Sequence, residues 1–244
     1  ISALTTLARD GKSWGKPALT YIEECNMERK LGRSVSEESN AKPLVWGKLL
    51  ESRVFDLLGL EYIITSTETD IHPSINYWAG SKDGLKLDSG KTVFDIKSPI
   101  TLKSFCQLVD PLYAGLEGMD AMNVIRDKHK DGDKYYWQLV SNSIINGTRY
   151  AELIVYVPYL SEMPEVKLMA DGVPNCYWIA MAGEEELPYL VDGGYYKNLN
   201  IIRFENLAAQ GQGQHGAYSG LRAPAAFFPE SHLGSDTQWS PSSD

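Results

Sequence analysis

The strand-like segment 91–97, KTVFDIK, places two opposite charges on the same side of the chain. Side chains alternate between the two faces of a strand, so Asp95 and Lys97 share one face while Phe94 and Ile96 share the other. A carboxylate beside a fixed ammonium group can position a metal ion and a water molecule for hydrolysis. The same acid-x-lysine triplet also occurs as an ordinary surface ion pair, so the triplet alone is a weak indication.

Two further carboxylates could join this pair. Asp83 stands about a dozen residues upstream in SKDG, where an aspartate beside glycine is most often only a turn residue. Glu51 lies in a helical stretch, and its neighbours at i+3, i+4 and i+7 are all apolar. A carboxylate on such a face needs a partner or a metal ion, and the alternative partner is Arg53 or a lysine elsewhere in the chain.

Glu51, Asp83 and Asp95 are three oxygen donors, and Lys97 is the neighbouring cation. This is the set that metal-assisted phosphodiester hydrolysis requires, with Lys97 orienting or helping to deprotonate the attacking water. Two carboxylates on adjacent strands repel each other unless a cation lies between them. The four histidines are scattered without ligand-type spacing, so the expected ion is a hard one, Mg²⁺ or alternatively Mn²⁺.

The elements that must position these residues alternate between helix and strand. Proline near the start and glycine after the end predict helices over residues 16–30 and 43–58, and a glycine stop at Gly147 ends a third predicted helix over 133–146. β-Branched and aromatic runs predict strands over residues 62–66, 76–80, 91–97, 151–159, 176–181 and 200–204, with a turn at 82–84. The pattern therefore predicts an α/β or α+β fold with a central mixed sheet.

Four blocks of sequence, in this order, resemble the YqaJ-like viral recombinases, the phage lambda exonuclease-type branch of the PD-(D/E)xK nucleases. The blocks are LVWGKLLESRVFDLLG, AGSKDGLKL, VFDIKSPITLKSF and YYWQLVSNSIINGTRYAELIVY. The resemblance covers roughly Trp14 to Pro158, and it is specific because the order and the spacing of all four blocks agree. It implies a restriction-endonuclease-like core in which helices flank a central mixed β-sheet.

The resemblance implies roles for residues in the first two blocks. Glu51 matches the helix glutamate of the WGK-x-x-E block. Asp83 matches the aspartate of the family's S-P-D-G motif, in which Lys82 here replaces the usual proline. Both residues are thereby implied to be metal ligands and part of the catalytic set.

The last two blocks supply the remaining implied site residues. Asp95 and Lys97 match the family's E-x-K pair, with aspartate in place of the commoner glutamate. The backbone carbonyl of Ile96 is implied as a further metal ligand. Gln138 matches the motif glutamine that lines the active site of the family, although on its own it is an uninformative polar residue of a helix.

The family's activity is Mg²⁺-dependent digestion of linear double-stranded DNA from its ends, 5′ to 3′, with release of mononucleotides. The remaining 3′ strand passes to a single-strand annealing protein, and many members are toroidal trimers. The resemblance therefore implies a phage or prophage DNA exonuclease of recombination that acts in the cytoplasm of a bacterial host. No apolar run approaches the roughly 18–20 residues of a membrane span, so no membrane association is expected.

The family also carries an upstream W…R…T-A-S block, whose arginine contacts the terminal 5′ phosphate. The sequence begins at ISALTTLARDGKSWGK, after that block, so Arg9 is not assigned this role. We predict a nuclease domain over residues 1–206 that lacks the block. Residues 207–244 are rich in Gly, Ser, Gln and Pro without periodicity, which predicts a disordered or non-native tail.

Two alternatives to the exonuclease hypothesis remain open from the sequence. One is another PD-(D/E)xK enzyme, either an endonuclease or a structure-specific nuclease. The other is a non-catalytic module that binds DNA ends as a scaffold, although such a module has no need for carboxylates that repel DNA. Cas4-type relatives are disfavoured because three unclustered cysteines cannot hold an iron–sulfur cluster.

The net charge of the 244-residue chain bears on how DNA would be held. With 23 basic and 32 acidic residues the formal charge is −9, which by itself argues against a nucleic-acid partner. Residues 1–160, however, hold 19 basic and 21 acidic residues, whereas residues 161–244 hold 4 and 11. We therefore expect DNA to be held in a local channel rather than on a broadly basic surface.

Overall fold

The computed structural model describes residues 8, 10–35, 41–64, 69–88 and 91–206 of the chain. The predicted tail, 207–244, lies outside the described residues, as do the last two residues of the predicted strand 62–66. Within the described ranges, no helix is long and apolar enough to cross a membrane.

Helices and strands alternate along the chain, as the sequence pattern predicts. The helices are α1 (Lys16–Leu31), α2 (Lys42–Leu57), α3 (Leu102–Tyr113), α4 (Gly118–Lys128), α5 (Gly132–Asn146), α6 (Met163–Ala170) and α7 (Tyr177–Met181), with short 3-10 helices η1 (Leu160–Glu162) and η2 (Glu184–Glu186). The strands are β1 (Tyr62–Ile64), β2 (Asp70–His72), β3 (Ile75–Gly80), β4 (Gly84–Lys86), β5 (Thr92–Lys97), β6 (Tyr150–Tyr156) and β7 (Leu199–Glu205).

The central sheet has five strands in the order β1-β4-β5-β6-β7. Only β5 and β6 are parallel, because the three helices α3, α4 and α5 connect them; the other neighbouring pairs are antiparallel. Strands β2 and β3 form a separate hairpin. The predicted α/β fold with a central mixed sheet flanked by helices is confirmed.

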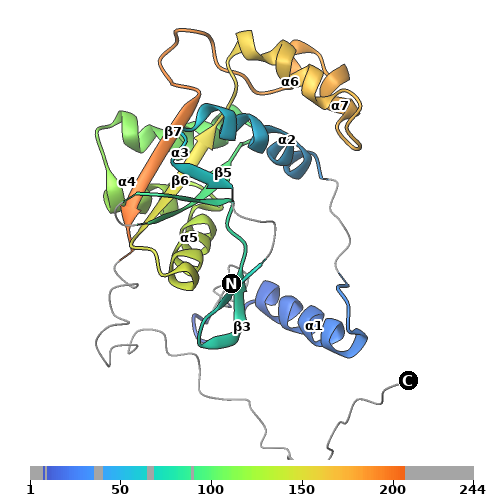
Figure 1. The fold of residues 1–244 in the computed structure, drawn as a ribbon, viewed down its shortest axis with the longest axis vertical. Coiled ribbons are helices and arrows are strands. Elements are labelled where there is room, and N and C mark those ends of the chain that lie inside the picture. Colours follow the sequence, from blue (N-terminus) through green and yellow to red (C-terminus); the bar gives the residue numbers. More distant parts are fainter. Residues whose placement is uncertain (1–7, 9, 36–40, 65–68, 89–90, 207–244) are drawn as a thin grey trace, which may run out of the picture.

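Helices cover both faces of the sheet, and each face has its own apolar core. Val93 of β5 packs into the core formed with α3, α4 and α5. Phe94 and Ile96 pack into the core formed with α2, α6 and α7. Figure 1 shows α2, α6 and α7 together on one side of the sheet, α5 on the other, and α1 away from it. The predicted alternation of faces along β5 is therefore confirmed, and α2 and α5 reach the same strand from opposite sides.

Three helices were predicted, and all three are present with no end shifted by more than one residue. Helix α1 begins with Pro17 in its first turn and ends at Gly32, and α5 ends at Gly147. Both glycines adopt the left-handed conformation, with φ of 66° and 60°, which residues with a Cβ rarely adopt. Glycine at these positions therefore fixes where each helix stops.

The predicted strand over residues 176–181 is wrong, because this segment forms helix α7. The Ile179 N–H donates to the Cys176 carbonyl at 2.8 Å, which is a helical turn rather than a strand ladder. Ile179 is buried in the core that α7 shares with α2 and α6, while Tyr177 and Met181 are exposed. A short apolar run with aromatic residues is compatible with either structure, and here the burial of one residue per turn decides for helix.

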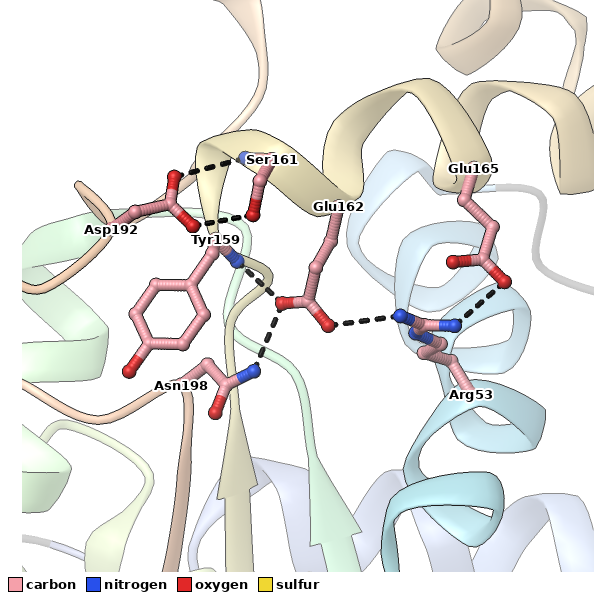
Figure 2. Close-up of polar contacts among 7 residues, drawn as sticks. All are labelled: Arg53, Tyr159, Ser161, Glu162, Glu165, Asp192 and Asn198. Carbon is pink, nitrogen blue, oxygen red and sulfur yellow. Dashed lines mark hydrogen bonds and ion pairs between the residues drawn. The ribbon is translucent and has the colours of Figure 1, made fainter.

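An ionic network fixes α2 against the chain that follows β6. Arg53 of α2 contacts the Glu162 carboxylate at 3.0 Å and the Glu165 carboxylate at 2.7 Å. Glu162 also accepts hydrogen bonds from the Tyr159 N–H at 2.7 Å and from the Asn198 amide at 2.9 Å (Figure 2). Because Glu162 is bonded from three sides, it holds α2 in place relative to the end of the sheet.

This network predicts an acid-dependent stability difference for Glu162→Gln. Burial raises the pKa of Glu162, but its bonds to the Tyr159 N–H, Asn198 and Arg53 outweigh burial, so the pKa lies below its ordinary value of 4.5. The charged form therefore stabilises the fold above that value, and this contribution disappears as the pH falls through the lower pKa of the folded protein. At pH 7 we expect the variant to lose about 1 kcal/mol, or 2–4 °C in Tm.

Thermal unfolding measured between pH 7 and pH 3 checks this prediction. Glu165→Gln is the matched control, because Glu165 contacts the same arginine but its side chain is 55% exposed, against 13% for Glu162. Exposed ion pairs contribute little, so the control is expected to melt close to the unmodified protein. A Tm difference for Glu162→Gln that persists unchanged at pH 3 would contradict the assignment.

Candidate active site

A cavity of about 460 Å³ lies where β5 ends, between α2 and α5. The five side chains that the sequence singled out all line it, together with Ile96; they are Glu51, Asp83, Asp95, Lys97 and Gln138. They come from α2, the turn before β4, β5 and α5. The structure thus brings together residues that are up to 87 positions apart in the sequence.

Asp95 is the most deeply buried of these acids, with its side chain 1% exposed. Its Oδ1 accepts a hydrogen bond from Gln138 Nε2 at 2.8 Å, and its Oδ2 forms an ion pair with Lys97 Nζ. The Gln138 amide therefore fixes the orientation of the Asp95 carboxylate, with Lys97 held against its second oxygen.

Asp83 reaches the end of β5 through the turn that precedes β4. Its Oδ2 accepts a hydrogen bond from the Ile96 N–H at 2.6 Å. Gly84 makes this approach possible, because a Cβ there would stand 2.3 Å from Phe94 Cζ of β5 and 2.4 Å from the Ile63 carbonyl oxygen of β1. Burial, together with the negative charge of Asp95, raises the pKa of Asp83 to about 7. The two aspartates therefore repel each other across the cavity.

Glu51 is the third acid of the cavity, and Arg53, which the sequence suggested as its partner, does not neutralise it. Arg53, two residues later on α2, instead pairs with Glu162 and Glu165. Burial raises the pKa of Glu51, and the negative charge of Asp95 raises it further. The alternative interpretation of Glu51 as one half of an ion pair with Arg53 is therefore wrong.

Lys97 is held between a carboxylate and an aromatic ring. Its ammonium group lies 5.1 Å from the centre of the Tyr135 ring, in addition to its ion pair with Asp95. Burial lowers the pKa of Lys97, but the Asp95 carboxylate outweighs burial, so the pKa lies above its ordinary value. Lys97 is therefore a cation in this cavity. Tyr135 was not predicted, although it stands one helical turn before Gln138 on the same face of α5.

A row of polar side chains on α5 continues past Gln138 and connects the helix to the chain around the cavity. Asn142 and Asn146 follow Gln138 at intervals of four residues and so share its helix face. The Asn142 amide donates to the Ser81 carbonyl at 2.8 Å, and the Asn146 amide donates to Asp70 at 3.3 Å. This row ties the β2–β3 hairpin and the chain leading to Asp83 onto α5. The spacing of the three amides was visible in the sequence, but nothing there showed what they would contact.

The replacement of proline by Lys82 in the turn has a structural partner. The Lys82 ammonium forms an ion pair with Asp70 of β2, and its side chain is only 5% exposed. Lys82 therefore anchors the turn to the β2–β3 hairpin and is not among the residues that line the cavity.

Lysines surround the cavity even though the whole chain is acidic. Four lysines line it, opposed by Asp131 and the three candidate catalytic acids; the lysines are Lys48, Lys97, Lys130 and Lys134. If a divalent ion offsets the charge of the catalytic acids, the cavity becomes positive. The lining thus holds four basic and four acidic side chains, whereas the whole chain carries a formal charge of −9.

The donors around the cavity fit a hard divalent cation by their chemical type. Carboxylate and carbonyl oxygens are the ligands that Mg²⁺ prefers, and it commonly takes one or two carboxylates and keeps several waters. Asp83 and Asp95 supply two carboxylates whose mutual repulsion a cation would relieve. Among the described residues, no three Asp, Glu, His or Cys side chains are grouped closely enough to hold an ion by themselves. The fit is therefore to an ion held by two carboxylates and completed by other oxygen ligands.

No protein-family model and no curated protein matches the chain. Solved structures do match it. An alkaline exonuclease (LHK-Exo) from Laribacter hongkongensis is 16% identical over 82% of this chain and 74% of its own, with a TM-score of 0.46. LHK-Exo in complex with dAMP is 18% identical over 86% and 77%, with a TM-score of 0.48. A phage-related exonuclease from Haemophilus somnus 129PT is 13% identical over 83% and 80%, with a TM-score of 0.51. The chain shares its fold with the Haemophilus protein.

Proposed function

We propose that the chain is a Mg²⁺-dependent deoxyribonuclease that hydrolyses phosphodiester bonds of linear double-stranded DNA, with Mn²⁺ as a substitute ion. The observation that supports this most is that Glu51, Asp83, Asp95, Lys97 and Gln138 line a single cavity. Structural ion pairs need no such arrangement, since three acids facing one cavity cost stability when no cation offsets them. The fold shared with a phage-related exonuclease agrees with this proposal.

In the proposed site, Asp83, Asp95 and the backbone carbonyl of Ile96 hold the ion, with Glu51 completing the acidic set. The N–H and C=O of a strand residue point to the same side, and the Ile96 N–H already bonds Asp83, so its carbonyl faces the same edge of the sheet. When bound, the ion supplies Lewis-acid activation of the attacking water and offsets the charge that develops on the phosphate.

Lys97, Gln138 and Tyr135 orient the reacting groups and stabilise the charge that develops on the phosphate. Lys97, a cation beside Asp95, positions the attacking water and stabilises negative charge on the phosphate. Gln138 keeps the Asp95 carboxylate in one orientation, so that the second oxygen stays beside Lys97. Tyr135 supports the lysine from the other side through its ring face.

We extend the proposal to the biological role that the sequence resemblance suggests. The substrate is then a DNA end digested 5′ to 3′ during phage-type recombination, and the partner is a single-strand annealing protein that takes the 3′ strand. A trimeric ring in the cytoplasm of a bacterial host is the matching assembly. These features are supported by the order and spacing of the four sequence blocks and by the shared fold.

Linear and covalently closed circular duplexes of the same sequence test this proposal directly. In Mg²⁺ we expect the linear duplex to be degraded to mononucleotides and the closed circle to remain intact. Cleavage of the closed circle at a comparable rate would instead identify an endonuclease. Binding of linear ends without cleavage, in either Mg²⁺ or Mn²⁺, would overturn the enzymatic proposal in favour of a scaffold that binds DNA ends.

A further inference from the structure

A serine hydroxyl on the wall of the catalytic cavity is oriented by a buried histidine. Ser104, in the first turn of α3, lines the cavity, whereas His129, at the end of α4, does not. The Ser104 Oγ and the His129 Nε2 are 2.6 Å apart. No part of the proposed hydrolysis uses this pair, although it lies beside the catalytic residues.

The contacts of His129 decide which partner donates. Its Nδ1 accepts a hydrogen bond from the Asp131 N–H at 3.1 Å, so Nδ1 carries no proton. Burial lowers the pKa of His129, which keeps the ring neutral at neutral pH. A neutral ring without a proton on Nδ1 has one on Nε2, and His129 therefore donates to the Ser104 oxygen.

This arrangement excludes a serine nucleophile and leaves a hydrogen-bond donor. A histidine whose Nε2 is protonated cannot take the proton of Ser104, as a general base would have to. The Ser104 hydroxyl accepts from His129 and keeps its own hydrogen, for which the described residues provide no acceptor. Because Ser104 lines the cavity, that hydrogen is available to a ligand there.

The surroundings of Ser104 favour an anionic ligand. Lys130 and Lys134 line the same cavity, and Asp131 offsets the first of these through a contact of 3.8 Å between Lys130 Nζ and Asp131 Oδ2. Within the described ranges Lys134 forms no ion pair, so it contributes an uncompensated positive charge. The N-terminus of the twelve-residue helix α3 adds the positive end of a helix dipole on the same side.

Building on the proposed nuclease function, we propose that Ser104 and Lys134 form a phosphate subsite in the catalytic cavity, which binds a phosphodiester group of the substrate strand next to the one being cleaved. Ser104 donates a hydrogen bond to a non-bridging oxygen, and Lys134 pairs with the charge. His129 is a positioning residue, because it acts through the hydroxyl of Ser104. Tyr135 contacts both His129, with 5.5 Å between the ring centres, and the ammonium group of Lys97, and so lies between the subsite and the catalytic lysine.

Binding of a linear duplex oligonucleotide in EDTA, and its cleavage in Mg²⁺, test the subsite separately from the chemistry. We expect Ser104→Ala to weaken binding by about tenfold, as loss of a hydrogen bond to a charged group predicts. KM should rise by a similar factor while kcat changes by less than about twofold. Lys134→Gln should reduce the slope of log K against log salt concentration by roughly 0.9, the value for one phosphate contact on duplex DNA.

Two controls match these variants. Ser161→Ala removes a hydroxyl that is bonded to Asp192 outside the cavity, and Lys128→Gln removes an exposed lysine two residues before Lys130. Both are expected to bind the oligonucleotide like the unmodified protein. Equal effects of Lys128→Gln and Lys134→Gln on the salt slope would overturn the proposal, because they would indicate general charge rather than a subsite.

The positioning role of His129 has its own test. His129→Leu removes the donor and should weaken binding as Ser104→Ala does, whereas His129→Gln retains an N–H donor and should restore most of it. If His129→Leu does not fold, the comparison of His129→Gln with Ser104→Ala still decides, because tenfold weaker binding in the glutamine variant contradicts positioning through an N–H donor.

The remaining outcomes separate the subsite from the proposed function. Binding that depends on Ser104 and Lys134 in a protein that cleaves no DNA would support the subsite and reject the nuclease. Cleavage that is unaffected in both variants would support the nuclease and reject the subsite. An effect of Ser104→Ala that is seen only on 5′-phosphorylated oligonucleotides, and not on those with a 5′ hydroxyl, would also reject it, because the ligand would then be a terminal phosphate.

Discussion

Replacing Asp95 by asparagine is expected to lower the rate of DNA cleavage in Mg²⁺ by at least about a thousandfold, which is typical for removal of a charged catalytic group. Asparagine has nearly the same shape and can still hydrogen-bond Gln138, so the fold should be retained. What is lost is the negative charge that faces both Lys97 and the proposed ion. Cleavage of a fluorescently labelled linear duplex measures the rate, and circular dichroism verifies folding.

Lys97→Met provides the second half of the same test. Methionine keeps an unbranched apolar stem beside the Tyr135 ring but has no charge, so loss of activity would come from the missing ammonium group. Asp120→Asn is the matched control, because Asp120 is an exposed aspartate of α4 that does not line the cavity. Retention of more than about a tenth of the cleavage rate in either Asp95→Asn or Lys97→Met would reject the catalytic assignment, given the size of the expected effect.

The sequence was informative about β5 for a physical reason. A strand alternates its side chains strictly, so the pattern of charged and apolar residues in 92–97 determines which residues share a face once the segment is known to be a strand. The structure places Phe94 and Ile96 in one core and Asp95 beside α5, as that pattern predicts. The helix ends at Gly32 and Gly147 could also be predicted from the sequence, because few residues other than glycine adopt the left-handed conformation there.

Other parts of the fold depend on tertiary contacts that no local pattern contains. The run 176–181 has strand-like composition but forms α7, because Ile179 is buried in the apolar core that α7 shares with α2 and α6. Helix α3, by contrast, was missed although its sequence carries local helix signals. Thr101 caps the helix by accepting a hydrogen bond from the Ser104 N–H, and the buried Phe105, Leu108 and Val109 follow helical spacing. Only in residues 176–181 does packing outweigh the local preference of the residues.

Some residues of the candidate site could likewise be predicted from the sequence, and others could not. The acids and the lysine could be named from residue type and spacing, and the structure places all of them around one cavity. The role of Asn142 could not be predicted, because its partner is the backbone carbonyl of Ser81, 61 residues away, and only the fold brings them together. The partners of Arg53 were equally hidden, since Glu162 and Glu165 lie more than 100 residues downstream.

Divalent ions should control both the activity and the stability of the protein. We expect EDTA to abolish cleavage and Mg²⁺ or Mn²⁺ to restore it. A ligand that binds only the folded state stabilises it, by about 2.7 kcal/mol when its concentration is 100 times its Kd. For a chain of this size such a gain corresponds to a rise in Tm of about 5–10 °C. A thermal melt in EDTA and in increasing Mg²⁺, without DNA, measures this effect independently of catalysis.

Asp83→Asn identifies where the ion binds. The asparagine side-chain oxygen can still accept the hydrogen bond from the Ile96 N–H, so the turn before β4 should keep its place at the end of β5. The variant loses the carboxylate charge, and with it the repulsion between Asp83 and Asp95 that an ion would relieve. We therefore expect Asp83→Asn to melt at the same temperature with and without Mg²⁺, while Asp120→Asn keeps the full rise. A full Mg²⁺-dependent rise in the Tm of Asp83→Asn would show that the ion binds elsewhere. Undiminished cleavage by the unmodified protein in EDTA would show that the reaction needs no divalent ion.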